Sequence, residues 1–438
     1  MFKKYFLSSI PEVNKLASSH DKKRHGFISV YVVGALFFIP MYLMGEAMHS
    51  WGWVTPLFNF TLLWCFLPYL VVVKLHYDSL KLVPVDQRLL LPLISVVPYL
   101  LLVLLFALFQ ARYARSAVSL VVSLTLVWFF VSSRWLDSKP QLRILLLQPS
   151  LWSDLQNRIH GVAINDFFVQ PVPLNKLEGE VANDDFDGVL VGHPDSLDSH
   201  QSRQLARLKQ WHVRLYTVPS LFEMLTGRLD VETLKDSLWH PEGNPLLDSF
   251  KRSFDFVSVL ITAPVWVPLM VVVGLLVKIS SPGPIFFSQT RTGQFGEAFT
   301  LFKFRTMHTA NLGEPSFTGR NDRRVTRLGK FLRRTRLDEL PQLLNVLGGS
   351  MSLIGPRPEQ QRFVEDFAMS LPSYPYRHLV RPGISGWAQV MQGYAASKQD
   401  TLVKLSYDLY YVKHYSLSLD LLILIKTVRV VLTGFGAR

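Results

Sequence analysis

The sequence has little of two things that most soluble proteins carry, cysteine and charge. Cys65 is the single cysteine among 438 residues, which excludes an intrachain disulfide and a zinc site built from several thiolates. Charged residues make up only 18% of the chain, whereas hydrophobic residues make up 49%. Such a composition excludes a disordered chain and argues against an ordinary soluble protein.

Acidic residues are also scarce relative to basic ones. The chain has 33 Asp and Glu against 46 Lys and Arg, a formal net charge of +13. A basic balance is typical of proteins that bind nucleic acid or an anionic membrane face, and the apolar content here favours the membrane.

What the sequence does have is a series of long apolar runs in its first third. Each is near the ~20 residues that a helix needs to cross the hydrocarbon core. The runs are Phe27–Met48, Pro56–Val73, Leu89–Phe109 and Ser116–Trp135. We therefore expect residues 1–140 to form a bundle of four transmembrane helices, because a soluble protein would have to be much larger to bury them.

The basic residues around these runs predict their orientation. Lys and Arg precede the first run, lie between the second and third, and follow the fourth, whereas the loop His49–Thr55 has none. By the positive-inside rule, the N-terminus, the middle loop and everything after Arg143 face the cytoplasm. Arg112 and Arg115, in the second outer loop, run against this pattern.

Residues 141–247 are expected to form a small cytoplasmic α/β domain. Short apolar runs such as Arg143–Leu147, Gly188–Gly192 and Val213–Thr217 are typical of buried strands, and polar stretches with helical spacing separate them. This alternation predicts a parallel, Rossmann-like sheet. The segment contains no GxGxxG fingerprint and no P-loop, which favours a non-catalytic role in packing, docking or homodimer formation.

Residues 248–282 contain a fifth apolar run, Phe256–Val277, with basic residues at both ends. By composition alone it would be a fifth transmembrane span, which would put the rest of the chain outside. Pro264 and Pro268 interrupt the run, and each removes a backbone donor and crowds the preceding turn. We therefore expect a helix–break–helix that enters the inner leaflet and returns, a re-entrant membrane helix.

The remaining residues, 283–438, carry the charged side chains expected of a mixed α/β catalytic domain. Lys303 and Arg305 alternate with apolar residues, so on a strand they would share one face. A basic tract follows: Arg320, Arg323, Arg324, Arg327, Lys330, Arg333, Arg334 and Arg336. Such a tract is most often a solvated face or a contact with anionic lipid. Nucleic acid is the alternative, but no nucleic-acid-binding module is visible.

Two adjacent carboxylates, Asp338 and Glu339, end this tract. Consecutive helix positions diverge by about 100°, so the two cannot act as a paired acid and base on one face. They suit separate roles, one as a nucleophile towards a phosphoryl group and the other as a Mg²⁺ ligand. A pair of acids that merely favours a helix dipole is the alternative.

Two loops rich in glycine and proline each present an arginine, Arg357 within Gly355–Pro358 and Arg381 within Arg381–Gly383. Arginine suits bidentate contacts with phosphate, and glycine lets a backbone approach one closely. Cations, a carboxylate pair, two such loops and a membrane-embedded helix together favour phosphoryl transfer between a soluble diphosphate and a lipid phosphate.

The chain from about Lys251 onward resembles the bacterial polyprenyl-phosphate hexose-1-phosphate transferases, the monotopic phosphoglycosyl transferase superfamily. The matching elements are Lys251–Asp255, Ser281–Phe287, Lys303–Met307, Asp338–Gln342, Met351–Pro358 and Arg381–Val390. With its four N-terminal spans and α/β segment, the whole chain is similar to the long members of that family.

The resemblance implies that a UDP-sugar, with a hexose such as glucose or galactose favoured, gives its sugar-1-phosphate to undecaprenyl phosphate. It implies Asp338 as the nucleophile that forms a covalent phosphosugar intermediate and Glu339 as the Mg²⁺ ligand. Lys303, Arg305, Arg357 and Arg381 would bind phosphate. The implied location is the bacterial inner membrane, with the catalytic domain in the cytoplasm, and the implied product starts a capsule, exopolysaccharide or O-antigen.

Three departures from the family's pattern stand out. Arg336 occupies a position that is commonly a small hydroxyl residue, Val267 stands where a serine usually precedes Pro268, and Met391–Tyr394 replaces a common Asn-Gly-Arg. No role is assigned to Tyr394. Two other hypotheses are a catalytically idle scaffold for polysaccharide assembly and a nucleic-acid-binding membrane regulator. The scaffold predicts a broken carboxylate pair or broken arginine loops, and the sequence has neither.

Overall fold

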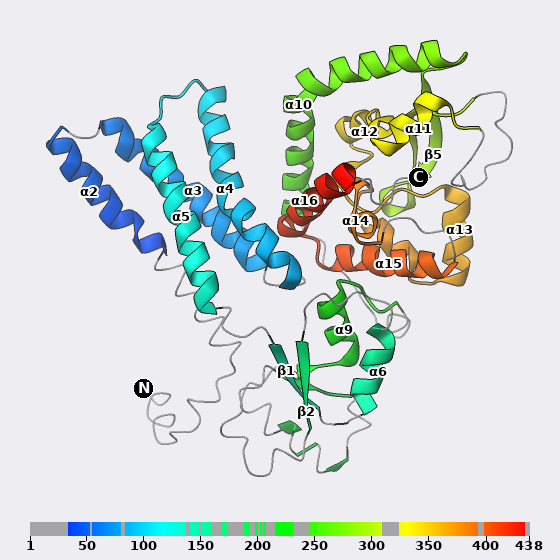
Figure 1. Ribbon diagram of the computed structural model, residues 1–438, viewed down its shortest axis with the longest axis horizontal. Coiled ribbons are helices and arrows are strands. Elements are labelled where there is room, and N and C mark those ends of the chain that lie inside the picture. Colours follow the sequence, from blue (N-terminus) through cyan, green and yellow to red (C-terminus); the bar gives the residue numbers. More distant parts are fainter. Residues whose placement is uncertain are drawn as a thin grey trace. The chain divides into compact units, whose positions relative to one another are not determined.

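Figure 1 presents a computed structural model of the chain, which divides into two compact units, Met1–Gly227 and Arg228–Arg438. The structure describes residues 34–52, 55–79, 84–136, 141–146, 148, 150–159, 168–173, 188–192, 198–199, 202–203, 205–206, 215–231, 245–308, 324–392 and 398–433. The start of the first apolar run, Arg320, Arg323 and Tyr394 lie outside the described residues.

The described part of the first unit begins with four helices: α2 (Phe38–Ser50), α3 (Pro56–Ser79), α4 (Pro84–Leu108) and α5 (Arg115–Leu136). Helix α3 packs against the other three, and α4 packs against α5. A buried hydrogen bond of 3.0 Å between the hydroxyls of Tyr99 and Thr125 joins α4 to α5. Helices α3, α4 and α5 overlap the second, third and fourth apolar runs of the sequence, and α2 covers the second half of the first run.

Two helices of the described chain are long and apolar enough to cross a membrane, judged by length and composition. They are Pro56–Leu75 and Pro245–Ser280, whereas the apolar helices Ile94–Ala107 and Arg115–Trp128 are shorter. The chain is thus mostly helical with two candidate spans, and the bundle of four spans stays an expectation.

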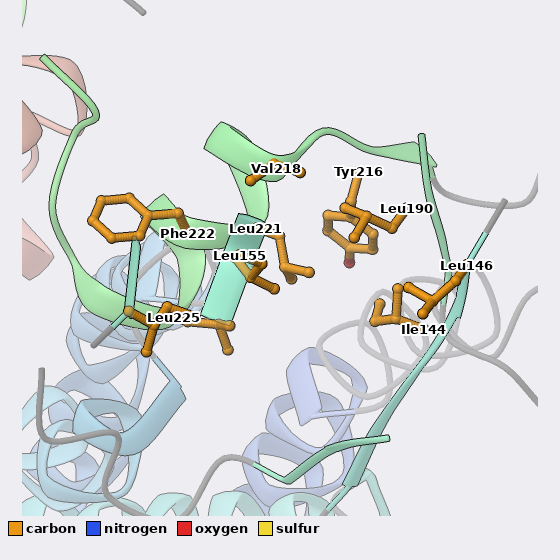
Figure 2. Packing of buried hydrophobic residues seen from close by; sticks show 10 residues of the cluster. Ile144, Leu146, Leu155, Leu190, Tyr216, Val218, Leu221, Phe222 and Leu225 are labelled. Carbon is orange, nitrogen blue, oxygen red and sulfur yellow. The ribbon is translucent and has the colours of Figure 1, made fainter. Parts of the chain in front are cut away.

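A small parallel sheet follows the helices. Its strands lie in the order β2-β1-β3-β4: β1 (Gln141–Leu146), β2 (Phe168–Pro173), β3 (Gly188–Leu190) and β4 (Leu215–Tyr216). Figure 2 shows how α6 (Ser150–Ile159) and α9 (Val218–Thr226) cover it with apolar side chains, among them Leu155, Leu221 and Phe222. The parallel strands expected in this segment are therefore present.

The second unit is mainly helical and carries two small sheets. Strands β5 (Phe286–Thr292) and β6 (Ala298–Phe304) form an antiparallel hairpin, and β7 (Ser352–Ile354) pairs in parallel with β8 (Gly383–Ser385). The helices are α10 (Pro245–Ser280), α11 (Arg327–Arg334), α12 (Gln342–Gly348), α13 (Gln361–Ser370), α14 (Trp387–Met391), α15 (Lys398–Lys413) and α16 (Leu417–Thr433).

Helix α10 contains both expected break points. It is helical from Pro245 to Ser280, so it does not end at Pro264 or Pro268, and Figure 1 draws it as two arms that meet at a bend. A proline inside a helix removes one backbone hydrogen bond and is the usual cause of such a kink. The indole of Trp266 donates to the carbonyl of Val259 at 2.9 Å, which ties the segment before Pro264 to the segment after it.

One side of α10 packs on the rest of the second unit along both arms. Val259 and Trp266 belong to a buried cluster with Leu301 of β6 and Val346 of α12. Further along the helix, Val273 and Val277 belong to a second cluster with Phe304 and Leu332. The opposite side exposes an apolar surface: Val257, Leu260, Ile261, Val265, Val271, Val272, Leu275, Leu276 and Ile279.

The segment Arg228–Val231 packs against α15 although it precedes α10 in the chain. Helix α9 ends at Gly227, which adopts φ 65°, and the next residues turn onto α15. The backbone amide of Leu229 donates to the carbonyl of Ser406 at 2.9 Å, and Leu229 and Val231 join a buried cluster with Leu405 and Leu409. The second unit therefore begins before the segment 248–282 that the sequence singles out.

Candidate active site

The two adjacent carboxylates lie in a short 3₁₀ turn, Leu337–Glu339, between α11 and α12. The turn starts from Arg336, whose backbone is left-handed with φ 59° and ψ 13°. A non-glycine residue in this region is strained, and such strain is concentrated at functional sites. Asp338 and Glu339 are 9% and 7% exposed, so the turn directs both carboxylates into the protein.

Glu339 is surrounded by cations. Its Oε1 atom lies 2.7 Å from Nη2 of Arg357, 3.3 Å from Nζ of Lys303 and 3.7 Å from Nη1 of Arg336. Burial alone would raise the pKa of Glu339, but Arg357, Lys303 and Arg336 outweigh it and hold the pKa well below its usual range. Burial lowers the pKa of Lys303. Lys303 and Arg357, two of the expected phosphate ligands, therefore meet at Glu339.

Asp338 has a different environment from its neighbour. Its Oδ1 atom is buried without a hydrogen-bond donor. Burial and the adjacent charge of Glu339 raise the pKa of Asp338, and Lys303, Arg357 and Arg333 partly oppose them. A buried carboxylate oxygen without a donor is costly for the fold, and such unsatisfied groups are found at catalytic sites. Asp338 is thus the less satisfied of the two carboxylates.

The loop that carries Arg357 is anchored by one buried and one half-buried set of ion pairs. Arg377 donates through Nη2 to the carbonyl of Arg357 at 2.9 Å and to Oδ2 of Asp408 at 2.7 Å. Glu359 pairs with Lys404 and lies 3.8 Å from Arg291. Burial would raise the pKa of Glu359, but these cations hold it at about 2. Both anchors fix the backbone from which Arg357 reaches Glu339.

Arg305 lies elsewhere, one residue beyond the end of β6, the strand that carries Lys303. Its Nη2 atom donates to the carbonyl of Ser281 at 2.6 Å and to the Ser281 hydroxyl at 2.9 Å. The guanidinium therefore caps the C-terminal end of α10, where a cation is favourable. Arg305 holds the end of α10 next to the end of β6, and it makes no described contact with Asp338 or Glu339.

The two arginine-bearing loops lie against each other. A Cβ atom on Gly383 would lie 2.0 Å from the Gly355 amide nitrogen, and one on Gly355 would lie 2.3 Å from the Arg381 carbonyl oxygen. These glycines are therefore needed for contact between the loops, a use that the sequence alone does not reveal. Arg381 is half-buried, and among the described residues it forms no ion pair with either carboxylate.

One site residue, Arg333, was not singled out from the sequence. It belongs to the basic tract, yet its Nε atom donates to the hydroxyl of Thr306 at 2.9 Å and its charge lowers the pKa of Asp338. Only the rotation of α11 distinguishes Arg333 from the other cations of the tract. A one-dimensional pattern carries no signal for that rotation.

The donor set for a metal ion is sparse. The described residues hold no group of three or more His, Cys, Asp or Glu side chains. Mg²⁺ does not need such a group, since one or two carboxylates and substrate phosphates can hold it. Glu339 fits this use, but the three cations around it would repel a divalent ion until a diphosphate adds negative charge.

The family model described as "Bacterial sugar transferase" matches residues 246–434. The match covers α10, both carboxylates and both arginine-bearing loops. It begins after Arg228–Val231 and after the whole first unit.

Several characterised proteins are similar to this chain. The UDP-N-acetylgalactosamine-undecaprenyl-phosphate N-acetylgalactosaminephosphotransferase of Aeromonas hydrophila is 40% identical over 341 residues, covering 76% of this chain and 77% of that protein. A UDP-glucose:undecaprenyl-phosphate glucose-1-phosphate transferase of Xanthomonas campestris is 35% identical over 260 residues, 56% of this chain and 53% of its own length. One of the same name from Escherichia coli is 42% identical over 183 residues, 41% of this chain and 39% of its own.

Proposed function

The chain belongs to the family of bacterial sugar transferases, and on this premise we propose that it transfers a sugar-1-phosphate from a UDP-sugar to undecaprenyl phosphate. The products are an undecaprenyl-diphosphate-linked sugar and UMP. The product starts a surface polysaccharide such as a capsule, an exopolysaccharide or an O-antigen. The observation that carries the proposal is the buried Asp338, whose Oδ1 has no donor, beside a glutamate held by three cations.

The reaction proceeds in two displacements at one phosphorus atom. The Asp338 carboxylate attacks the phosphorus that bears the sugar, a phosphorus–oxygen bond to the UMP portion breaks, and UMP leaves with the electron pair. A phosphate oxygen of undecaprenyl phosphate then attacks the same phosphorus and releases the Asp338 carboxylate. Two steps suit substrates from different phases, because the soluble donor and the lipid acceptor need not meet.

The cations around Glu339 supply electrostatic stabilisation. Phosphoryl transfer depends mainly on positioning and on neutralising charge as it redistributes. Lys303 and Arg357 already lie within 3.3 Å of Glu339, so a phosphate bound at Asp338 would exchange part of these contacts. Arg333 is the third cation in this role. Arg381 is assigned to the donor on the strength of its loop, which contacts the loop of Arg357.

We extend the proposal to Mg²⁺, which Glu339 would hold together with the donor's diphosphate. The ion would supply positive charge against the two phosphoryl groups. It would enter with the donor, because the cations around Glu339 oppose its binding alone. Weak binding of Mg²⁺ without donor and tight binding with it would be measurable by calorimetry.

The membrane arrangement belongs to the same proposal. Both arms of α10 pack on one unit through the two buried clusters, which supports a helix that enters and leaves one leaflet. The exposed apolar surface of α10 would face lipid. With the basic loops inside, the catalytic unit lies on the cytoplasmic side of the inner membrane, where nucleotide sugars are made.

Two sugar classes are candidates. A hexose such as glucose agrees with the relatives from Xanthomonas and Escherichia, whose overlap covers 56% and 41% of this chain. An N-acetylhexosamine agrees with the Aeromonas relative, whose overlap covers 76%. The longer overlap is the specific observation that favours the second class.

The test is UMP release by membranes that contain the protein, with undecaprenyl phosphate and a panel of UDP-glucose, UDP-galactose and their N-acetylated forms. Asp338→Asn should abolish release, because an amide cannot form the acyl phosphate. The matched control is Asp366→Asn on the exposed side of α13, which should keep full activity. Near-normal release by Asp338→Asn would reject the covalent role.

A further inference from the structure

Helix α11 displays a basic face that the proposed reaction does not use. Arg327, Lys330, Phe331 and Arg334 are exposed, and Phe331 is 56% exposed. Their spacing of three, one and three residues puts all four within about 100° of the helix circumference. We call these four residues the α11 face. None of its three cations forms an ion pair with any described residue.

The other sides of α11 are already occupied. Leu332 is buried with Val273 and Val277 of α10, and Gly329 lies so close to β6 that a Cβ atom there would be 2.2 Å from the carbonyl oxygen of Thr306. Arg333 points to Thr306 and influences Asp338. The α11 face therefore diverges from the cation that serves the reacting phosphate.

The neighbourhood of α11 identifies what the face meets. In Figure 1, α11 lies below one arm of α10, and the cluster with Val273 and Val277 joins α11 to the C-terminal part of that helix. This part of α10 exposes Val272, Leu275 and Ile279, at 53%, 57% and 81%. An apolar strip of this kind is typical of a membrane or protein contact, and the membrane placement proposed for α10 makes lipid the contact here. A helix packed beside it lies at the level of the head groups.

We propose that the α11 face binds the anionic head groups of the membrane, with Phe331 inserted into the interface. Three cations with no ion-pair partner among the described residues, around one exposed aromatic side chain, are the chemistry of an interfacial basic helix. Because Asp338 follows Arg334 by four residues, this contact fixes the height of the nucleophile above the lipid surface. The proposal needs the placement of α10 beside lipid but not the transferase reaction itself.

The test uses the full chain, whose single cysteine makes site-specific labelling simple. In a Cys65→Ser background, Phe331→Cys is labelled with a fluorophore and reconstituted into vesicles that contain spin-labelled phosphatidylcholine as quencher. The control label is Met369→Cys on α13, at a residue that is 84% exposed. We expect the label at position 331 to be quenched and the label at position 369 to be unaffected.

Lipid charge and protein charge are then varied together. Each basic residue near an anionic surface contributes about 1 kcal/mol, roughly fivefold in an equilibrium constant. Quenching at position 331 should rise several-fold when phosphatidylglycerol replaces half of the phosphatidylcholine, and salt should reduce the rise. Arg327→Glu with Lys330→Glu should abolish the rise, whereas Arg362→Glu on α13 should not.

Three outcomes would overturn the proposal. Absence of quenching at position 331 would mean that the α11 face lies away from lipid. Quenching that is indifferent to phosphatidylglycerol and to the charge reversal would mean that the cations do not bind head groups. If the Arg327→Glu with Lys330→Glu variant raises KM for undecaprenyl phosphate equally in vesicles with and without phosphatidylglycerol, the face captures the acceptor instead. The quenching measurement does not depend on turnover. It therefore tests the lipid contact separately from the proposed transferase reaction.

Discussion

The two units of the chain bury different kinds of side chain. In the first unit, the described buried polar residues are nearly all uncharged, such as Thr61 and Thr125, and Glu223 is the charged exception. In the second unit, the described buried residues include Lys251, Asp255, Arg305, Asp338, Glu339, Arg377 and Asp408. Burying a charge costs several kcal/mol unless it is paired. In the second unit, such buried charges include Asp338 and Glu339, the two carboxylates of the proposed phosphate site.

The largest effect is expected from breaking the ion pair that is most deeply buried among the described residues. The side chains of Arg377 and Asp408 are each 2% exposed, and removal of one partner leaves a buried charge unpaired. Arg377→Ala should therefore destabilise the second unit by about 3 to 5 kcal/mol. The pair Arg158–Asp154 of the first unit is 34% and 46% exposed, so Arg158→Ala should cost at most about 1 kcal/mol. Thermal melting in detergent would compare them, and equal shifts would contradict the contrast between the units.

The next effect concerns where the second unit begins. Leu229 is 6% exposed and packs with Leu405 and Leu409, so Leu229→Ala should cost about 2 to 4 kcal/mol through the cavity it leaves. Leu246→Ala is the control, because Leu246 is 84% exposed. A fragment from Arg228 to the C-terminus should also melt higher than one from Asp248. If the two fragments melt alike, the segment Arg228–Val231 is not part of the folded unit.

The sequence identifies residues that meet at the candidate site more readily than it identifies the contacts that support them. Asp338, Glu339, Lys303 and Arg357 were identified because ordered motifs carry them. Arg305 was expected to bind phosphate because alternate residues of a strand share a face. The alternation of residue types does not say which other part of the chain packs against that face. In the structure the neighbour of Arg305 is the end of α10, contributed by residues 24 positions away.

Other features depend on contacts that no local pattern encodes. Gly355 and Gly383 were expected to admit a phosphate, whereas they admit each other's backbone. The two prolines of α10 were expected to break the helix, and the structure bends it without ending it, since the packing of Val259, Trp266 and Val273 supports both arms. Leu229 and Val231 carry no motif at all, and only the fold brings them to α15.

A pH profile would test the charge environment of Asp338. Burial and Glu339 raise the pKa of Asp338, and only its ionised form can attack phosphorus. As pH falls, kcat/KM for the donor should therefore decline at a higher pH than an ordinary aspartate, with its pKa of about 3.9, would cause. Arg333→Gln removes a cation that lowers this pKa, so the acidic limb should move to higher pH. Arg334→Gln, on the exposed face of α11, is the control and should leave the acidic limb in place. If Arg333→Gln also leaves the limb in place, Arg333 does not influence the pKa of Asp338.

The smallest effect is expected at the bend of α10, where one hydrogen bond ties the two arms. Trp266 is 7% exposed and its indole donates to the Val259 carbonyl, which Thr262 also approaches with its hydroxyl at 3.2 Å. Trp266→Phe keeps an aromatic ring in the cluster but removes the donor, which should cost about 1 kcal/mol.

Because Thr262 still reaches the carbonyl, the bend should survive this substitution. A cysteine introduced at Gly283 in the Cys65→Ser background should then stay inaccessible from outside the cell. Trp51→Phe, at a residue 66% exposed in the first unit, should change neither stability nor labelling. If Trp266→Phe alone exposes position 283 to the outside, the prolines do not suffice to bend the helix, and the indole is what keeps both ends of α10 on one side of the membrane.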